Sequence, residues 1–187
     1  MAKKLNIMKT RRTILFFIFC LIIFFCQAQI KDKISLDINE LMSVKIYDFD
    51  KISWKSSYHT TTEEGKPELP YYRVSYVLPL DAVVSGIKFN ILKKQKLWED
   101  IYIYPCQAPI LSNQPYPTKF TVPNEKVYMS NTAYPDKLYE IESDDIFQGY
   151  HIVTFRIYPL EYIPKGKILN YYPQLEYTVE YEYKKDV

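Results

Sequence analysis

Cysteine, histidine and glycine are scarce in this chain, whose 187 residues include three, two and four of them, respectively. Cys20 and Cys26 lie in an apolar N-terminal stretch, so only Cys106 remains in the rest of the chain, where no internal disulfide can form. His59 and His151 are far apart and, with one thiol, lack the spacing of a zinc site. No glycine-rich phosphate loop is present either. These absences exclude a disulfide scaffold, a zinc site and a nucleotide-binding loop of the usual kind.

The few nucleophilic and basic residues do not form a recognisable catalytic set. A cysteine nucleophile needs a neighbouring base, yet Cys106 stands at the expected end of a strand and His151 lies in an alternating run, Gly149–Phe155. A histidine with ordinary hydrogen bonds is the simpler interpretation of that run. Calcium binding is the alternative for the acidic residues within 140–145, but paired acids are common in turns between strands. We expect no catalytic residue, no cofactor and no metal, and therefore no enzyme.

The N-terminal stretch has the pattern of a secretory signal peptide. Basic residues within Lys3–Arg12 precede an apolar run, Ile14–Phe25, and Ala28 offers a small residue at the cleavage position. The 12 residues of the run are fewer than the roughly 20 that cross a bilayer, which disfavours a membrane anchor. A lipoprotein would need a small residue before Cys26, where a phenylalanine stands. We predict a signal peptide over residues 1–28 and one domain over residues 29–187.

Removing this leader reverses the sign of the net charge. The whole chain carries 24 Lys and Arg against 22 Asp and Glu, and five of the basic residues belong to the leader. The remaining chain is therefore slightly acidic, and no basic patch suggests a nucleic-acid partner. The lysines within Lys93–Lys96 are interpreted as an exposed hairpin turn. The expected product is exported, to the periplasm or the extracellular space, with no membrane span after cleavage.

Alternation of apolar and polar residues predicts an all-β fold. Leu175, Tyr177, Val179, Tyr181 and Tyr183 alternate with polar residues, as expected for a half-buried antiparallel strand. The 19 Tyr and 10 Phe suit such pleated surfaces, whereas the 12 Pro favour strand ends and edges. Further strands are expected at Ile34–Ile38, Met42–Tyr47, Tyr72–Leu78, Val83–Leu92, Leu97–Tyr104, Lys137–Glu142 and Tyr150–Tyr158. No helix of ten residues is expected after the leader, and the predicted architecture is an antiparallel β-sandwich.

One segment has no regular pattern. Residues Ala108–Pro135 include five prolines and only short apolar runs. Loops of this length in compact domains are usually functional or disordered. We therefore expect a partner contact in this segment.

Two proline-containing motifs resemble a known family. Glu64–Pro70, followed by a strand that ends Val77-Leu78-Pro79, looks like the opening of the propeptide of the gingipain family of cysteine proteases, peptidase family C25. The run Gly149–Pro164 is similar to its closing pattern, in which a strand leads into a Pro-x-x-Tyr-x-Pro turn before a final long strand, here Lys167–Tyr183. The resemblance covers about Trp54 to Tyr183. Its motif residues are Gly65, Pro67, Leu69, Pro70, Pro159, Tyr162 and Pro164.

The resemblance implies recognition rather than catalysis. Propeptides of this family are β-sandwich-like domains that dock on the catalytic domain, block its cleft and act as intramolecular chaperones. The implied partner is a C25-type catalytic domain, either in cis in a longer product or in trans. Because the chain stops at Val187 without a catalytic domain, the expected product is a stand-alone inhibitor or a truncated zymogen.

The resemblance also suggests which side chains would enter the protease. The specificity pocket of gingipains prefers Arg or Lys, so a basic residue in the irregular segment is the expected plug. Lys119 and Lys126 are the two candidates. The alternative function is that of a secreted or periplasmic β-sandwich that binds carbohydrate or protein through exposed tyrosines, because tyrosine serves equally well in a core and on a binding face.

Overall fold

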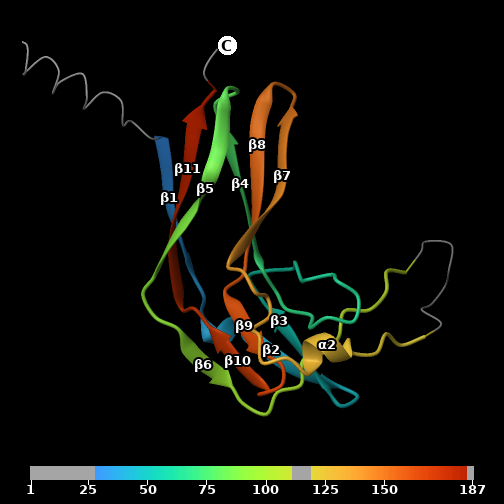
Figure 1. The fold of residues 1–187 in the computed structure, drawn as a ribbon. Coiled ribbons are helices and arrows are strands. Elements are labelled where there is room, and N and C mark those ends of the chain that lie inside the picture. Colours follow the sequence, from blue (N-terminus) through green and yellow to red (C-terminus); the bar gives the residue numbers. More distant parts are fainter. Residues whose placement is uncertain (1–27, 111–118, 185–187) are drawn as a thin grey trace, which may run out of the picture.

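The computed structural model describes residues 28–110 and 119–184, so the predicted signal peptide lies outside the described residues except for Ala28. These residues form strands, one 3-10 turn and one short helix (Figure 1). In chain order they are β1 (Ala28–Ser35), η1 (Ile38–Glu40), β2 (Leu41–Ile46), β3 (Phe49–Trp54), β4 (Tyr72–Leu78), β5 (Ala82–Ile91), β6 (Gln95–Trp98), α2 (Glu125–Tyr128), β7 (Tyr139–Phe147), β8 (Tyr150–Ile157), β9 (Leu160–Ile163), β10 (Ile168–Tyr171) and β11 (Gln174–Tyr183).

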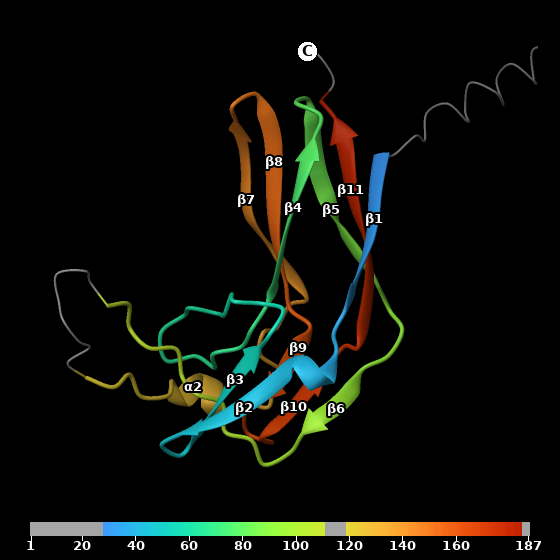
Figure 2. The same cartoon turned by 180° about the vertical axis from the view of Figure 1, so that it is seen from behind.

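Two three-stranded antiparallel sheets form a sandwich. One has the order β1-β11-β5 and the other β4-β8-β7, and the chain crosses between them at the turn from β4 to β5. Figures 1 and 2 show both sheets at one end of the molecule. The small sheet β6-β10-β9, the hairpin β2-β3 and helix α2 occupy the other end. The prediction of an antiparallel all-β sandwich is confirmed.

The two central strands of the sandwich provide its core. In β11 the alternate residues Leu175, Tyr177 and Val179 are buried, and in β8 Val153 and Phe155 are fully buried. The period of two places these side chains on the inner face of each sheet, while charged residues of β11 remain outside. The same apolar cluster continues into the other half of the molecule through buried residues of β3, β9, β10 and the segment around Ile101–Ile103.

The predicted hairpin around Lys93–Lys96 is wrong. Strand β5 pairs with β11 and β6 pairs with β10, so β5 and β6 belong to different sheets. The predicted strand Leu97–Tyr104 is also wrong, because β6 ends at Trp98 and only isolated bridges follow. The backbone of Asp100 has φ 53°, a left-handed conformation that interrupts an extended strand.

Further boundaries differ from the prediction, and the strand expected at Lys137–Glu142 is β7, which continues to Phe147. The expected strand at Ile34–Ile38 ends at Ser35, and Ile38 begins the turn η1. The Pro-x-x-Tyr-x-Pro segment is strand β9 rather than a turn, and the turn follows it, where the amide of Lys167 donates to the carbonyl of Pro164 at 3.0 Å. The final strand is divided into β10 and β11, since Pro173 lies between them and its nitrogen has no hydrogen to donate to a sheet.

Residues 111–118 of the irregular segment Ala108–Pro135 lie outside the described residues, and the short helix α2 is the one regular element in the described part of the segment. No helix within residues 28–110 and 119–184 is long and apolar enough to span a membrane.

His151, on β8, links the β7-β8 hairpin to the turn between β4 and β5. Its Nε2 lies 2.5 Å from Oδ1 of Asp144 on β7, and its Nδ1 lies 3.1 Å from the carbonyl oxygen of Pro79, just after β4. Both partners are acceptors, so only the imidazolium can donate to both at once. The hydrogen bond to Asp144 and the one to Pro79 raise the pKa of His151, against burial and the nearby charge of Lys184.

The stability of a Val179 variant shows how well the last strand is packed. Replacing this fully buried side chain by alanine should lower the free energy of unfolding by about 1 to 3 kcal/mol, because a cavity is left in the core. Thr178→Ala, on the opposite face of β11, is the matched control and should cost less. Denaturant unfolding monitored by circular dichroism measures both, and equal stability of Val179→Ala and the unchanged chain would contradict the packing described.

The surroundings of His151 predict a pH dependence of stability. Because its pKa is raised in the folded state, its contribution is complete below the unfolded value of about 6.5 and is lost as the pH rises through the folded pKa. The free energy of unfolding should therefore fall as the pH is raised from about 6 to 8. His151→Gln should remove this part of the dependence. Unfolding curves at several pH values check it, and identical slopes in both proteins would contradict the assignment.

Candidate functional site

A side-chain clamp joins Gln107, just before the irregular segment, to Thr121, in the middle of it. The amide of Thr121 donates to Oε1 of Gln107 at 2.9 Å, and Nε2 of Gln107 donates to the carbonyl oxygen of Thr121 at 3.3 Å. The amide of Ala108 also donates to Oγ1 of Thr121 at 3.2 Å. The side-chain amide of Gln107 thereby forms the same pair of hydrogen bonds with the backbone of Thr121 that a residue of a neighbouring β-strand would form. The clamp brings together the beginning and the end of residues 108–120.

Gly65 forms backbone hydrogen bonds to residues on both sides of this clamp. Its amide donates to the carbonyl of Cys106 at 2.9 Å, and its carbonyl accepts from the amide of Asn124 at 2.8 Å. Its φ is +75°, and an added Cβ would lie 3.2 Å from the carbonyl oxygen of Val122. Only glycine has both the left-handed backbone and the space for this close approach. Gly65 therefore connects the loop at residues 63–68 both to Cys106, just before the clamp, and to Asn124, just after it.

All seven motif residues of the predicted family are buried. Leu69 and Thr61 are hydrogen-bonded backbone to backbone, Pro67 bridges to Pro105, and the hydroxyl of Tyr162 donates to the carbonyl of Ile101 at 2.9 Å. These residues hold the scaffold together and are not available to a partner. The motifs therefore describe the fold and not a contact surface.

An aromatic cluster surrounds Phe120, the residue directly before Thr121 of the clamp. The ring of Phe120 lies 5.8 Å from Tyr47, 5.8 Å from Phe49 and 5.9 Å from Tyr104, measured between centroids. Phe49 also stacks on Tyr102 at 4.9 Å. The cluster comes from the β2-β3 hairpin and from the segment after β6, and it holds Phe120 from several directions.

The two candidate lysines lie in different surroundings. Lys119 is exposed and directly precedes the clamped Phe120, and within residues 28–110 and 119–184 it has no ion-pair partner. Lys126 is the second residue of α2, where its amide donates to the side chain of the capping residue Asn124 at 3.1 Å. Its side chain lines a cavity.

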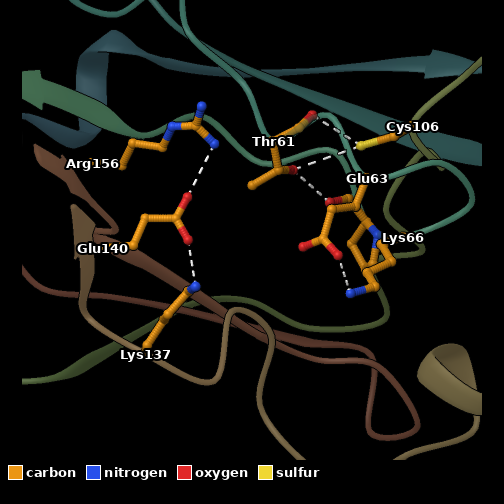
Figure 3. A network of polar contacts seen from close by, with 8 residues as sticks. Thr61, Glu63, Lys66, Cys106, Lys137, Glu140 and Arg156 are labelled. Atoms are coloured by element: carbon orange, nitrogen blue, oxygen red, sulfur yellow. Dashed lines mark hydrogen bonds and ion pairs between the residues drawn. The ribbon is translucent and has the colours of Figure 1, made fainter. Parts of the chain in front are cut away.

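That cavity has a volume of about 410 Å³, and polar and apolar groups contribute to its walls in about equal measure. Figure 3 shows Lys137, Glu140 and Arg156 on one side and Thr61, Glu63, Lys66 and Cys106 on the other. Glu140 accepts from Nη1 of Arg156 at 3.0 Å and also pairs with Lys137, while Lys66 pairs with Glu63.

Four of the charged groups around the cavity are paired within the chain, Glu140 with Lys137 and Lys66 with Glu63. Burial opposes ionisation of Glu140, but the hydrogen bond from Lys137 and the charges of Lys137 and Arg156 prevail and lower its pKa. The carboxylate therefore stays ionised and paired near neutral pH. It is a structural group and not a general acid or base.

Cys106 is also placed for structure. Its Sγ donates to the carbonyl oxygen of Thr61 at 3.0 Å, and burial raises its pKa to about 11. The thiol is thus protonated at neutral pH and is a poor nucleophile. His151 binds Asp144 and Pro79 at the far end of the sandwich, so the two residues do not form a dyad. No group of three metal-ligating side chains occurs in the part of the chain that the structure describes.

Sequence reasoning missed Gln107, Phe120 and Tyr47. Gln107 and Thr121 stand before and after the prolines of residues 108–120, which is the one signal that could have suggested a clamp. The contact of Tyr47 with Phe120 has no local signal, because the two residues are far apart in the sequence and meet only in the fold.

Comparisons with known proteins agree with this architecture. A family model described as Propeptide_C25 matches residues 28–187. A solved structure from a study of the zymogenic latency of gingipain K from Porphyromonas gingivalis has a TM-score of 0.66 and 20% identity, covering 82% of this chain and 86% of that chain. A complex of the pro- and mature domains of Porphyromonas gingivalis RgpB has a TM-score of 0.66 and 16% identity, covering 86% and 85%.

A search of curated proteins finds no match. The two structural likenesses are below 25% identity and establish the fold, whereas the family match covers nearly all the described residues. The predicted resemblance is confirmed, and the chain belongs to the C25 propeptide family.

Proposed function

We propose that the chain is an exported prodomain that binds the catalytic domain of a C25 cysteine protease and blocks its specificity pocket with Lys119. The observation that supports this proposal is the clamp between Gln107 and Thr121, beside which Lys119 is exposed. Family membership supports the choice of partner, as does the fold shared with the prodomain in a complex of pro- and mature domains.

The clamp matters because binding has an entropic cost. A segment with fixed ends loses less conformational freedom on binding than a free one, so more of the contact energy appears as affinity. Lys119 carries a mobile ammonium group that suits an acidic pocket, and it has no competing carboxylate among the described residues. Lys126 is exposed as well, but it fits the role less well, because it belongs to helix α2 and lines the cavity of this chain.

The export signal and the domain boundaries belong to the same proposal. Residues 1–28 serve as the signal peptide, and residues 29–187 form the exported domain, in the periplasm or outside the cell. Strand β1 begins at Ala28 and pairs with β11 along its whole length, which supports a folded domain starting near this position. The protease is bound in cis or in trans, and binding also assists its folding.

Inhibition measurements test the plug directly. Residues 29–187 titrated into a gingipain-type protease should suppress cleavage of a basic substrate at submicromolar concentration. Lys119→Ala should weaken inhibition about tenfold or more, because the pocket loses its charged occupant. Lys126→Ala is the matched control and should leave inhibition within about twofold.

The variants also separate the alternatives. Unchanged inhibition in both variants would refute the plug, and a loss confined to Lys126→Ala would move the contact to the cavity. No inhibition by the unchanged domain would favour the alternative function, a binding module for carbohydrate or protein.

A further inference from the structure

Tyr47 has an unusual backbone for an aromatic residue. It lies in the turn between β2 and β3 with φ 54°, in the left-handed region. Glycine, asparagine and aspartate adopt this conformation easily, whereas a bulky side chain does so only under strain. The other non-glycine residues with positive φ among the described residues are Asp100, Gln148 and Lys167, none of them aromatic. Tyr47 therefore occupies a place where asparagine or glycine would fit better.

The fold gains little from the ring of Tyr47. The residue is 81% exposed, so almost no apolar surface is removed from water. Its aromatic contact is an edge-on approach to Phe120, with an angle of 76° between the planes. Such pairs are worth about 1 kcal/mol when buried and less at the surface. Strain that the fold itself does not compensate often marks a functional position.

The surroundings of Tyr47 suggest what it contacts. Phe120, against which it rests, is adjacent to the proposed plug Lys119. Two more apolar side chains near the ends of the clamped segment are exposed, Ile110 by 60% and Val122 by 67%. Tyr47 and Phe120 thus form a rigid aromatic surface next to the lysine. Tyrosine is enriched among residues that dominate binding energy at protein interfaces.

We propose that Tyr47 is a contact residue of the prodomain, and that it packs with Phe120 against the apolar rim of the specificity pocket that receives Lys119. The partner is the C25-type catalytic domain, because a single docking event that inserts Lys119 also covers the surface beside it. The inference rests on the proposed function. It adds a second contact element from the β2-β3 hairpin, which is distant in sequence from the clamped segment.

The proposal predicts opposite changes in stability and in binding. Tyr47→Asn removes the left-handed strain, so the midpoint of thermal unfolding should rise by about 2 °C or more. The same substitution removes the aromatic contact, so the inhibition constant should rise about tenfold. A residue with a purely structural role would not show this combination.

Gln148 offers a matched control. It has φ 49° in the β7-β8 turn, at the end of the molecule opposite α2 (Figure 1). Gln148→Asn should also raise the unfolding midpoint, but it should leave inhibition unchanged because this turn is far from Lys119. Tyr47→Trp, which keeps an aromatic ring, should retain most of the inhibition.

Thermal unfolding and inhibition of a gingipain-type protease are measured for the unchanged domain, these three variants and Lys119→Ala. The proposal is supported if Tyr47→Asn is the one variant that combines a higher unfolding midpoint with weaker inhibition. Inhibition by Tyr47→Asn equal to that of the unchanged domain overturns it, as does a lowered midpoint, which would give the ring a structural role. If Lys119→Ala weakens inhibition in that case, the proposed function stands and only this inference fails. Absence of inhibition by the unchanged domain overturns both.

Discussion

The contact between the inner faces of β8 and β11 is the constraint on which the rest of this structure depends. Cys106 is the one cysteine of the described residues and it is free, so no covalent link holds the two sheets together. Their cohesion comes from apolar side chains such as Phe155 and Tyr177, which belong to one continuous core. Because both sheets bury their inner faces in this one cluster, separating them would expose the apolar side chains of both.

The candidate site is held by a different kind of interaction. Among the described residues 108–110 and 119–121, the contacts are mainly hydrogen bonds to backbone groups and ring contacts at the surface, and none of these side chains is fully buried. Hydrogen bonds of this kind contribute about 1 kcal/mol each and depend on geometry. They fix the direction of a segment well while adding little to global stability. Precise positioning and overall stability therefore come from separate parts of the chain.

Local patterns in the sequence predicted the strands with regular alternation well. The runs at β4, β8 and β11 were found because each buries one face, and the period of two follows directly from that burial. Strand pairing was not accessible in the same way. Leu175 of β11 pairs with Ile91 of β5, far away in the sequence, and nothing near the lysines at 93–96 indicates that β5 and β6 separate. The family resemblance predicts a turn at Pro159–Pro164, where the structure has strand β9.

The candidate site was less predictable than the fold. Composition correctly indicated an irregular segment, since prolines cannot donate to a sheet. The elements that organise it come from elsewhere in the chain: Gly65 from the loop after β3, and Phe49 from β3. Such contacts exist only after the chain has folded. A single sequence reveals which segment is irregular, but not what holds it.

The complete burial of the family motif has a consequence for how these domains evolve. Gly65, Pro67 and Tyr162 are constrained by packing, and they do not face a partner. The hydrogen bonds between Gln107 and Thr121 use backbone groups and these two side chains, so they place no demand on the side chains of Ala108–Ile110. Those positions can change while the scaffold is preserved. Members of a family with such a buried motif can therefore share a fold while sharing little sequence.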